Sequence, residues 1–165
     1  MKLRFRPIDI HSQVEILLVA KRMRETLKEV LGNDRGESMY SLDWLQDRVQ
    51  FHLDPERSEG QVLVAETLIN GELDNVGHTI LRFETDESNT RFGLFSTFYV
   101  VPEFRKQKVA SNFLTLGEQW MMEKHAVYGA TDTAKGNEKL IRLLSKSGYH
   151  KSFENLEMIR LKKVF

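Results

Sequence analysis

The segment RFGLFSTFYVV, residues 91–101, restricts the fold more than any other part of the sequence. Its residues are largely apolar at odd and even positions alike, so a strand formed here needs cover on both faces and belongs in the centre of a sheet. Pro102 ends that strand, because proline cannot donate a backbone hydrogen bond. A helix is predicted over residues 106–124, because apolar residues recur at spacings of four and three from Val109 onward. A strand at 126–132 would complete a β-α-β crossover, whose two strands run parallel.

The residues before this unit predict one strand and two helices. Residues 2–8 have the composition of a first strand. Ser12 and Glu15 form a capping box that starts a helix with one apolar face. The polar stretch 32–39 contains two glycines and is predicted to be an exposed loop. Ser41 then caps a second, shorter helix.

A β-hairpin is predicted between these helices and the central strand. Two β-type segments, 61–68 and 76–84, flank the dipeptide Asn70-Gly71. Asn-Gly between two strands favours a tight hairpin turn, because both residues tolerate positive φ angles. The early strands are therefore expected to be antiparallel.

The C-terminal part adds a helix and the last strands. Asn137 is expected to cap a short helix that Gly148 ends. Residues 149–162 would then supply one or two closing strands. The predicted order is β-α-α-β-β-β-α-β-α-β in a single domain, residues 1–165. It describes a mixed α/β fold with a central sheet of six to seven strands flanked by four helices.

Composition narrows the classes of function. Lys plus Arg and Asp plus Glu both number 24, so the net charge is zero and gives no electrostatic reason to expect nucleic acid or an anionic membrane as the main partner. The sequence has no run of about 18 apolar residues that would predict a membrane span. It has no cysteine, and its five histidines show no HExxH spacing, so a thiolate nucleophile and a dedicated metal site are not expected. The lack of cysteine fits a cytoplasmic location.

The turn between the central strand and the following helix is the best candidate for chemistry. A helix N-terminus presents unpaired N–H groups and a partial positive charge, which suits a phosphate group. Arg105, Lys106 and Lys108 add positive side chains to the same turn. An ordinary basic surface loop has the same composition, so these residues alone leave an anion site and a solvated loop equally open.

Two motifs that follow one another along the chain decide between these alternatives. The pattern V-x-P-x-x-[RQ]-x-x-G-x-[GA] is matched by Val100, Pro102, Arg105 and Ala110, with Lys108 at the glycine position. The pattern N-x-x-A-x-x-[LF]-Y-x-K-x-G-F is matched in part by Asn137, Leu140, Leu143, Leu144, Lys146, Gly148 and Tyr149. With both motifs and the order of strands, the sequence resembles the GNAT superfamily of N-acetyltransferases over about residues 76–149.

The resemblance implies a binding site for acetyl-CoA, used as a co-substrate. The pantetheine arm would pair with the backbone of Phe98, Tyr99 and Val100, and Asn137 would lie near the pantetheine. The pyrophosphate would lie on the amides of the turn and the first helical turn, at Arg105, Lys106, Gln107, Lys108, Val109, Ala110 and Ser111. The strands at 91–101 and 126–132 would separate to leave a cleft for the thioester.

Three departures from the family pattern concern catalysis more than binding. Lys108 occupies the usual glycine position, and Leu144 replaces the tyrosine that many members use to protonate the leaving thiolate. The strand at 91–101 has no carboxylate, although some members carry a glutamate base there.

The catalytic candidates are therefore few. Glu84 could act as a base through water, and Ser96 and Thr97 could order that water. An ordinary role is the stronger interpretation of each: Glu84 fits a solvated turn residue better, and Ser96 and Thr97 fit hydrogen-bonded strand residues better.

The resemblance predicts an N-acetyltransferase in which the primary amine of a small molecule or a protein attacks acetyl-CoA directly. The alternative is a non-catalytic acyl-CoA-binding sensor or interaction module on the same fold. The sequence does not settle the oligomeric state, and a homodimer is one option because dimers are the commonest assembly.

Overall fold

The computed structural model describes residues 2–165. Its strands and helices follow the predicted order with one additional helix. In chain order they are β1 (Arg4–Pro7), α1 (Gln13–Leu31), α2 (Asn33–Ser38), α3 (Leu42–Leu53), β2 (Gly60–Ile69), β3 (Glu72–Thr85), β4 (Arg91–Val100), a 3-10 turn (Pro102–Phe104), α4 (Val109–Glu123), β5 (Tyr128–Ala134), α5 (Glu138–Lys146), β6 (His150–Glu154) and β7 (Met158–Val164). None of the helices in residues 2–165 is long and apolar enough to cross a membrane.

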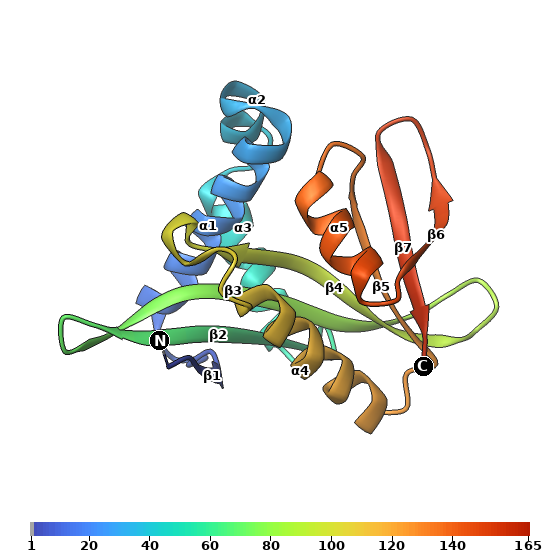
Figure 1. Cartoon of the computed structure of the whole chain (residues 1–165), viewed down its shortest axis with the longest axis horizontal. Coiled ribbons are helices and arrows are strands. Elements are labelled where there is room, and N and C mark those ends of the chain that lie inside the picture. Colours follow the sequence, from blue (N-terminus) through green and yellow to red (C-terminus); the bar gives the residue numbers. More distant parts are fainter. Residues whose placement is uncertain (1) are drawn as a thin grey trace.

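The strands form a single mixed sheet in the order β1-β2-β3-β4-β5-β7-β6 (Figure 1). All neighbouring pairs are antiparallel except β4 and β5, which run parallel. This confirms the crossover predicted for the central strand, and the two closing strands are both present. The predicted hairpin turn is also confirmed, because Asn70 and Gly71 adopt φ angles of 52° and 84° between β2 and β3.

Helices pack on both faces of the sheet (Figure 1). On one face, α4 and α5 pack on a core that includes Phe95, Phe113 and Leu144. On the other face, α1 and α3 pack on β2 and β3 around Val49 and Ile80. Apolar residues on both faces of the central strands are therefore buried, as a central position in the sheet requires.

Two helix predictions were wrong. Residues 32–39 are not a loop, because Asn33–Ser38 forms α2, which brings the number of α-helices to five rather than four. This helix is held by α1: a Cβ added to Gly36 would lie 2.4 Å from the Lys28 Cα, and Glu37 forms ion pairs with Arg24 and Lys28. Such close packing on a neighbouring helix cannot be deduced from the local composition of the segment.

The second wrong prediction concerns the start of α4. The helix begins at Val109 and not at 106, because Lys106 and Lys108 adopt positive φ angles of 64° and 66°. Left-handed residues cannot continue a right-handed helix. The turn before α4 is therefore longer than predicted, and this turn forms part of the candidate site.

Candidate functional site

The two parallel strands at the centre of the sheet pair over only part of their length. The β4–β5 register runs from Phe92 opposite Tyr128 to Phe95 opposite Thr131, and it ends there. The Thr131 hydroxyl donates to the Phe95 carbonyl at 2.8 Å and closes the paired part. Beyond this point β4 continues to Val100 with only β3 as a neighbour. The predicted separation of the two strands is present.

The open edge of β4 offers backbone groups to a ligand. The Val101 N–H donates to the Val76 carbonyl of β3 at 2.9 Å. Because successive residues of a strand direct their N–H and C=O groups to opposite edges, those of Val100 and Phe98 face away from β3, toward the gap. The Val100 carbonyl accepts from Arg105 Nε at 2.9 Å, which leaves the N–H groups of Val100 and Phe98 available there.

The turn before α4 presents a row of unpaired amides. Among the described residues, no backbone N–H from Lys106 to Ser111 donates to a protein acceptor, and the first that does is Asn112, to the Lys108 carbonyl at 3.0 Å. No side chain caps the helix at Lys108. Free N–H groups at a helix N-terminus, preceded by residues in the left-handed conformation, form a concave surface suited to an anion.

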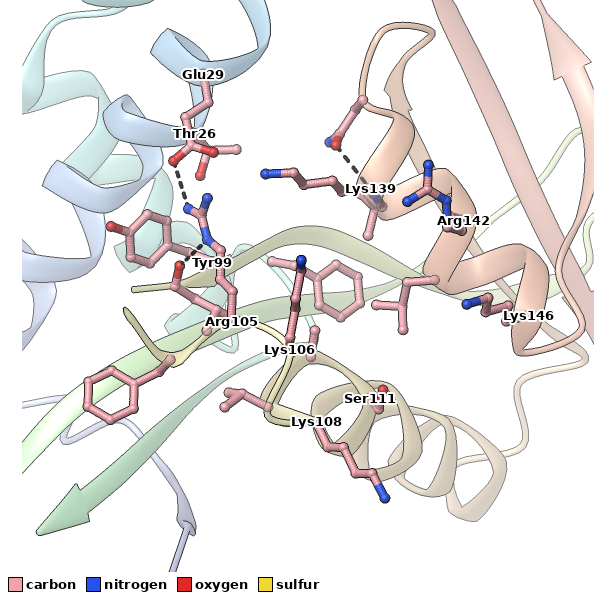
Figure 2. Close-up of a pocket in the computed structure, with 18 of the residues that line it drawn as sticks. Thr26, Glu29, Tyr99, Arg105, Lys106, Lys108, Ser111, Lys139, Arg142 and Lys146 are labelled. Atoms are coloured by element: carbon pink, nitrogen blue, oxygen red, sulfur yellow. Dashed lines mark hydrogen bonds and ion pairs between the residues drawn. The ribbon is translucent and has the colours of Figure 1, made fainter. Parts of the chain in front are cut away.

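These groups line a cavity of about 590 Å³ between β4, α4, α5 and α1 (Figure 2). Five basic residues contribute to its lining, and none of their side chains has an acidic partner among residues 2–165: Lys106, Lys108, Lys139, Arg142 and Lys146. The chain has zero net charge, so the cavity concentrates positive charge that is balanced elsewhere on the molecule. Such a cavity attracts a ligand with several negative charges.

Glu29 of α1 is the carboxylate that lines this cavity. It accepts from Arg105 Nη2 at 2.7 Å, while Nε of the same guanidinium donates to the Val100 carbonyl (Figure 2). Arg105 thus joins α1 to the end of β4 and fixes the conformation of the turn. Because Glu29 neutralises part of the Arg105 charge, Arg105 contributes less than a full positive charge to an anion bound at the turn.

The predicted cofactor residues lie together, with one exception. Those that line the cavity are Phe98, Tyr99, Val100, Arg105, Lys106, Lys108, Val109, Ala110, Ser111 and Asn137. Gln107 is exposed and donates its side-chain amide to the Glu103 carbonyl at 3.4 Å, outside the lining. The Asn137 amide is already used: its oxygen accepts from the Leu140 N–H at 3.4 Å, and its nitrogen donates to Thr133 Oγ1 at 3.1 Å.

The three catalytic candidates are placed differently. Glu84 lies opposite Phe92, at the end of the sheet away from the open edge of β4, and pairs with Arg82 at 2.7 Å, so the structure does not bring it to the cavity. The β3–β4 register places Glu84 at the opposite end of β4 from the unpaired residues 96–100. Ser96 and Thr97 begin the unpaired part of β4, and Ser96 forms a bulge against β3. Neither lines the cavity, and their roles stay predictions.

A buried histidine that the sequence did not single out lies next to Thr97. His78 of β3 is completely buried, and its Nε2 lies 3.3 Å from Thr97 Oγ1 while its Nδ1 has no partner among the described residues. Burial and the nearby Arg22 guanidinium lower the His78 pKa to about 3, so the imidazole is neutral. The Tyr99 ring stacks on His78 at 5.8 Å, and burial raises the pKa of its phenol.

The position predicted to have lost a catalytic tyrosine does not face the cavity. Leu144 is completely buried in the core beneath α5, and the neighbouring Leu143 lines the cavity instead. The absence of a hydroxyl at residue 144 therefore says little about the chemistry of this cavity. Within residues 2–165, no group of three or more His, Asp or Glu side chains is arranged to hold a metal ion.

The α5 wall of the cavity was also missed. Lys139, Arg142 and Lys146 lie on the same side of this helix, at spacings of three and four. Their spacing was visible in the sequence, but only the tertiary structure shows that this side of α5 faces the turn before α4 and not solvent alone (Figure 2).

Comparison with known proteins agrees with this geometry. The family described as Acetyltransferase (GNAT) family matches residues 20–149, which include the open strand edge, the turn and α5. The chain belongs to the GNAT acetyltransferase family. The match also includes most of α1 and all of α3, and so extends further toward the N-terminus than the resemblance over residues 76–149 that the motifs indicate. No curated protein matches the sequence significantly.

Solved structures share the fold of this GNAT protein at low sequence identity. The PaiA N-acetyltransferase from Thermoplasma acidophilum, in complex with coenzyme A, is 15% identical with a TM-score of 0.75, and 100% of each chain is covered. A chain of the NatC complex bound to Gag peptide and CoA is 14% identical with a TM-score of 0.68, covering 100% of this chain and 99% of that one. Ard1 from Thermoplasma volcanium is 15% identical with a TM-score of 0.68, covering 99% of this chain and 98% of its own.

Proposed function

We propose that this GNAT protein binds acetyl-CoA in the cavity and transfers the acetyl group to a primary amine by direct attack. The observation that carries the proposal is the row of free backbone N–H groups from Lys106 to Ser111, which opens into a cavity with unpaired cations beside the open edge of β4. The family match and the two CoA-bound structures of the same fold support coenzyme A as the ligand.

The donor groups fit the parts of acetyl-CoA. Amides and cations at the turn suit a pyrophosphate, because a helix N-terminus and neighbouring positive charges both stabilise an anion. The unpaired N–H groups of Phe98 and Val100 suit an extended arm that carries amide carbonyls. The apolar side chains of Phe98, Leu140 and Leu143 line the path between these two regions.

The reaction needs an oxyanion donor and a proton acceptor. Acetyl-CoA supplies the thioester, whose C–S bond breaks as the amine nitrogen bonds to the carbonyl carbon. The Val100 N–H is the donor that we assign to the carbonyl oxygen, since a fixed amide stabilises charge as it develops. Ser96 and Thr97, at the start of the unpaired part of β4, would order a water at the edge of the cavity that passes the amine proton to the departing thiolate. The thiolate needs no side-chain acid to leave, because thiols have a pKa of about 8.5.

A charge placed at the turn tests the binding site without weakening the helix. Ser111 is exposed in the first turn of α4 and lines the cavity, so Ser111→Asp adds a negative charge where the pyrophosphate would lie. An acidic residue stabilises a helix N-terminus, so the variant should unfold at the same temperature as the wild type or higher. Thr115→Asp, one turn further along α4 and outside the cavity, is the matched control.

Thermal shift and thiol release with a panel of amines distinguish the outcomes. We expect acetyl-CoA to stabilise the wild type and Thr115→Asp, and to bind Ser111→Asp about tenfold more weakly or worse. Equal stabilisation of both variants would show that the turn is not the phosphate site. Binding without thiol release for any amine would favour the alternative, a non-catalytic acyl-CoA sensor, whereas steady release with an amine would exclude it.

A further inference from the structure

Helix α5 carries more positive charge toward the cavity than a pyrophosphate at the turn requires. Lys139, Arg142 and Lys146 occupy positions i, i+3 and i+7, which lie on one side of a helix. All three line the cavity, and Figure 2 shows them along α5, across the cavity from Arg105 and Lys106. Like charges at these spacings repel one another, so their arrangement is unfavourable until an anion joins them.

Two basic residues near the sheet's C-terminal strands differ from these three. Arg160 binds Asp132 through two bonds of 2.6 and 2.8 Å, and Lys163 lies 2.9 Å from Glu118. No hydrogen bond or ion pair of the side chains of Lys139, Arg142 or Lys146 is present within residues 2–165. These cations are therefore free to bind a ligand.

The cavity thus has two separate positions for anions. One is the turn, where the amides from Lys106 to Ser111 converge, and the other is the basic side of α5 on the opposite wall. A pyrophosphate can occupy the first position. The second position requires another anionic group on the same ligand. Coenzyme A has such a group, because its adenosine carries a phosphate on the ribose 3′ oxygen.

We propose that Arg142 and Lys146, assisted by Lys139, bind the 3′-phosphate of acetyl-CoA and make the protein select it over the 3′-dephospho form. Guanidinium and ammonium groups form charge-assisted hydrogen bonds with phosphate, and Arg does so with two donors at once. The inference rests on the proposed function, since it assumes that the cavity binds acetyl-CoA.

Binding of two ligands to three proteins tests this assignment. Calorimetry would give the dissociation constants of acetyl-CoA and 3′-dephospho-acetyl-CoA for the wild type, for the double variant Arg142→Gln/Lys146→Gln and for Lys124→Gln. Glutamine keeps the helix propensity of α5. Lys124 is exposed at the end of α4, has no acidic partner among the described residues and does not line the cavity, so its variant controls for a loss of charge elsewhere.

We expect the wild type and Lys124→Gln to bind acetyl-CoA about tenfold more tightly than the dephospho form, which is the effect of one well-placed charged group. In the double variant this preference should fall to about twofold or less, while the affinity for the dephospho form stays unchanged. Added salt should also reduce the preference of the wild type, because these side chains are exposed.

The possible failures are distinct. If the wild type binds neither ligand, the proposed acetyl-CoA site is wrong. If the wild type binds both ligands equally, the site is correct but α5 does not recognise the 3′-phosphate. If the double variant loses affinity for both ligands in the same proportion, the α5 cations act on the pyrophosphate or on the whole cavity, and our assignment is overturned.

Discussion

Gly117 allows α4 to lie close enough to the sheet to place its N-terminal turn beside β4. A Cβ atom at this position would lie 2.3 Å from Phe95 Cε1 and 2.7 Å from Leu81 Cδ2, and both neighbours are completely buried. Carbon atoms in contact are normally about 3.5 to 4.0 Å apart. Gly117→Ala therefore forces α4 away from the sheet or displaces the Phe95 ring by about 1 Å.

Two opposing effects set the change in the free energy of unfolding of Gly117→Ala. Alanine stabilises a helix interior by about 1 kcal/mol relative to glycine. Overpacking of a filled core costs about 1 to 3 kcal/mol, and an overlap with a rigid aromatic ring belongs near the upper value. The net expectation is a loss of about 2 kcal/mol in the free energy of unfolding. For a chain of this size the loss lowers Tm by about 4 to 8 °C.

The displacement should also affect binding. The Phe95 ring stacks on Phe98 with a centroid distance of 5.0 Å, and Phe98 lines the cavity. A Phe95 ring displaced by the added methyl group would move Phe98 toward the space that we assign to the pantetheine arm. Acetyl-CoA affinity should therefore fall in Gly117→Ala together with Tm.

Calorimetric unfolding of a small set of variants checks the reasoning. Gly136→Ala makes the same chemical change where no atom lies within 4 Å of the new Cβ, and it should leave Tm unchanged or slightly higher. In a Phe95→Leu background, Gly117→Ala should cost about 1 kcal/mol less, because the smaller side chain vacates the contested space. A Gly117→Ala protein as stable as the wild type would refute the close approach of α4 on which the estimate depends.

Three further predictions concern other parts of the structure. Lys108→Gly should raise Tm by about 2 °C, because glycine avoids the cost of a φ angle of 66°, and a lower Tm in thermal unfolding would contradict this. The folded pKa of His78, about 3, lies below its unfolded value of about 6.5, so its contribution to stability is complete above pH 6.5 and is lost as the pH falls from about 6.5 toward 3. Urea unfolding within this window should show that the free energy of unfolding of the wild type falls by about 1.4 kcal/mol more per pH unit than that of His78→Gln. An equal fall in the two proteins would mean that His78 takes up its proton in the folded protein as readily as in the unfolded one. Tyr149→Phe should cost about 1 kcal/mol through the lost hydrogen bond to Glu118, 3.1 Å long, and leave acetyl-CoA affinity unchanged in the same thermal-shift assay.

Local sequence was enough to predict most elements that frame the site. The central strand, its parallel partner and the Asn70-Gly71 turn follow from apolar patterns and turn residues whose effects act over a few positions. The backbone part of the site was predictable for the same reason, since a strand that ends at Pro102 and leads into a helix presents free amides whatever surrounds it. The part of the site on the opposite wall of the cavity, where α5 carries Lys139, Arg142 and Lys146, could not be predicted in this way.

The sequence by itself thus determined the kind of fold, the family and the turn that offers amides to a phosphate, because these depend on residues close together in the chain. The tertiary structure decided which side chains share the cavity. It placed Glu84 away from the cavity through the register of β3 against β4, directed Leu144 into the core, and brought Glu29 and the cations of α5 to the cavity. These contacts join residues far apart in the sequence, and they depend on how helices pack on a sheet, which no local pattern specifies.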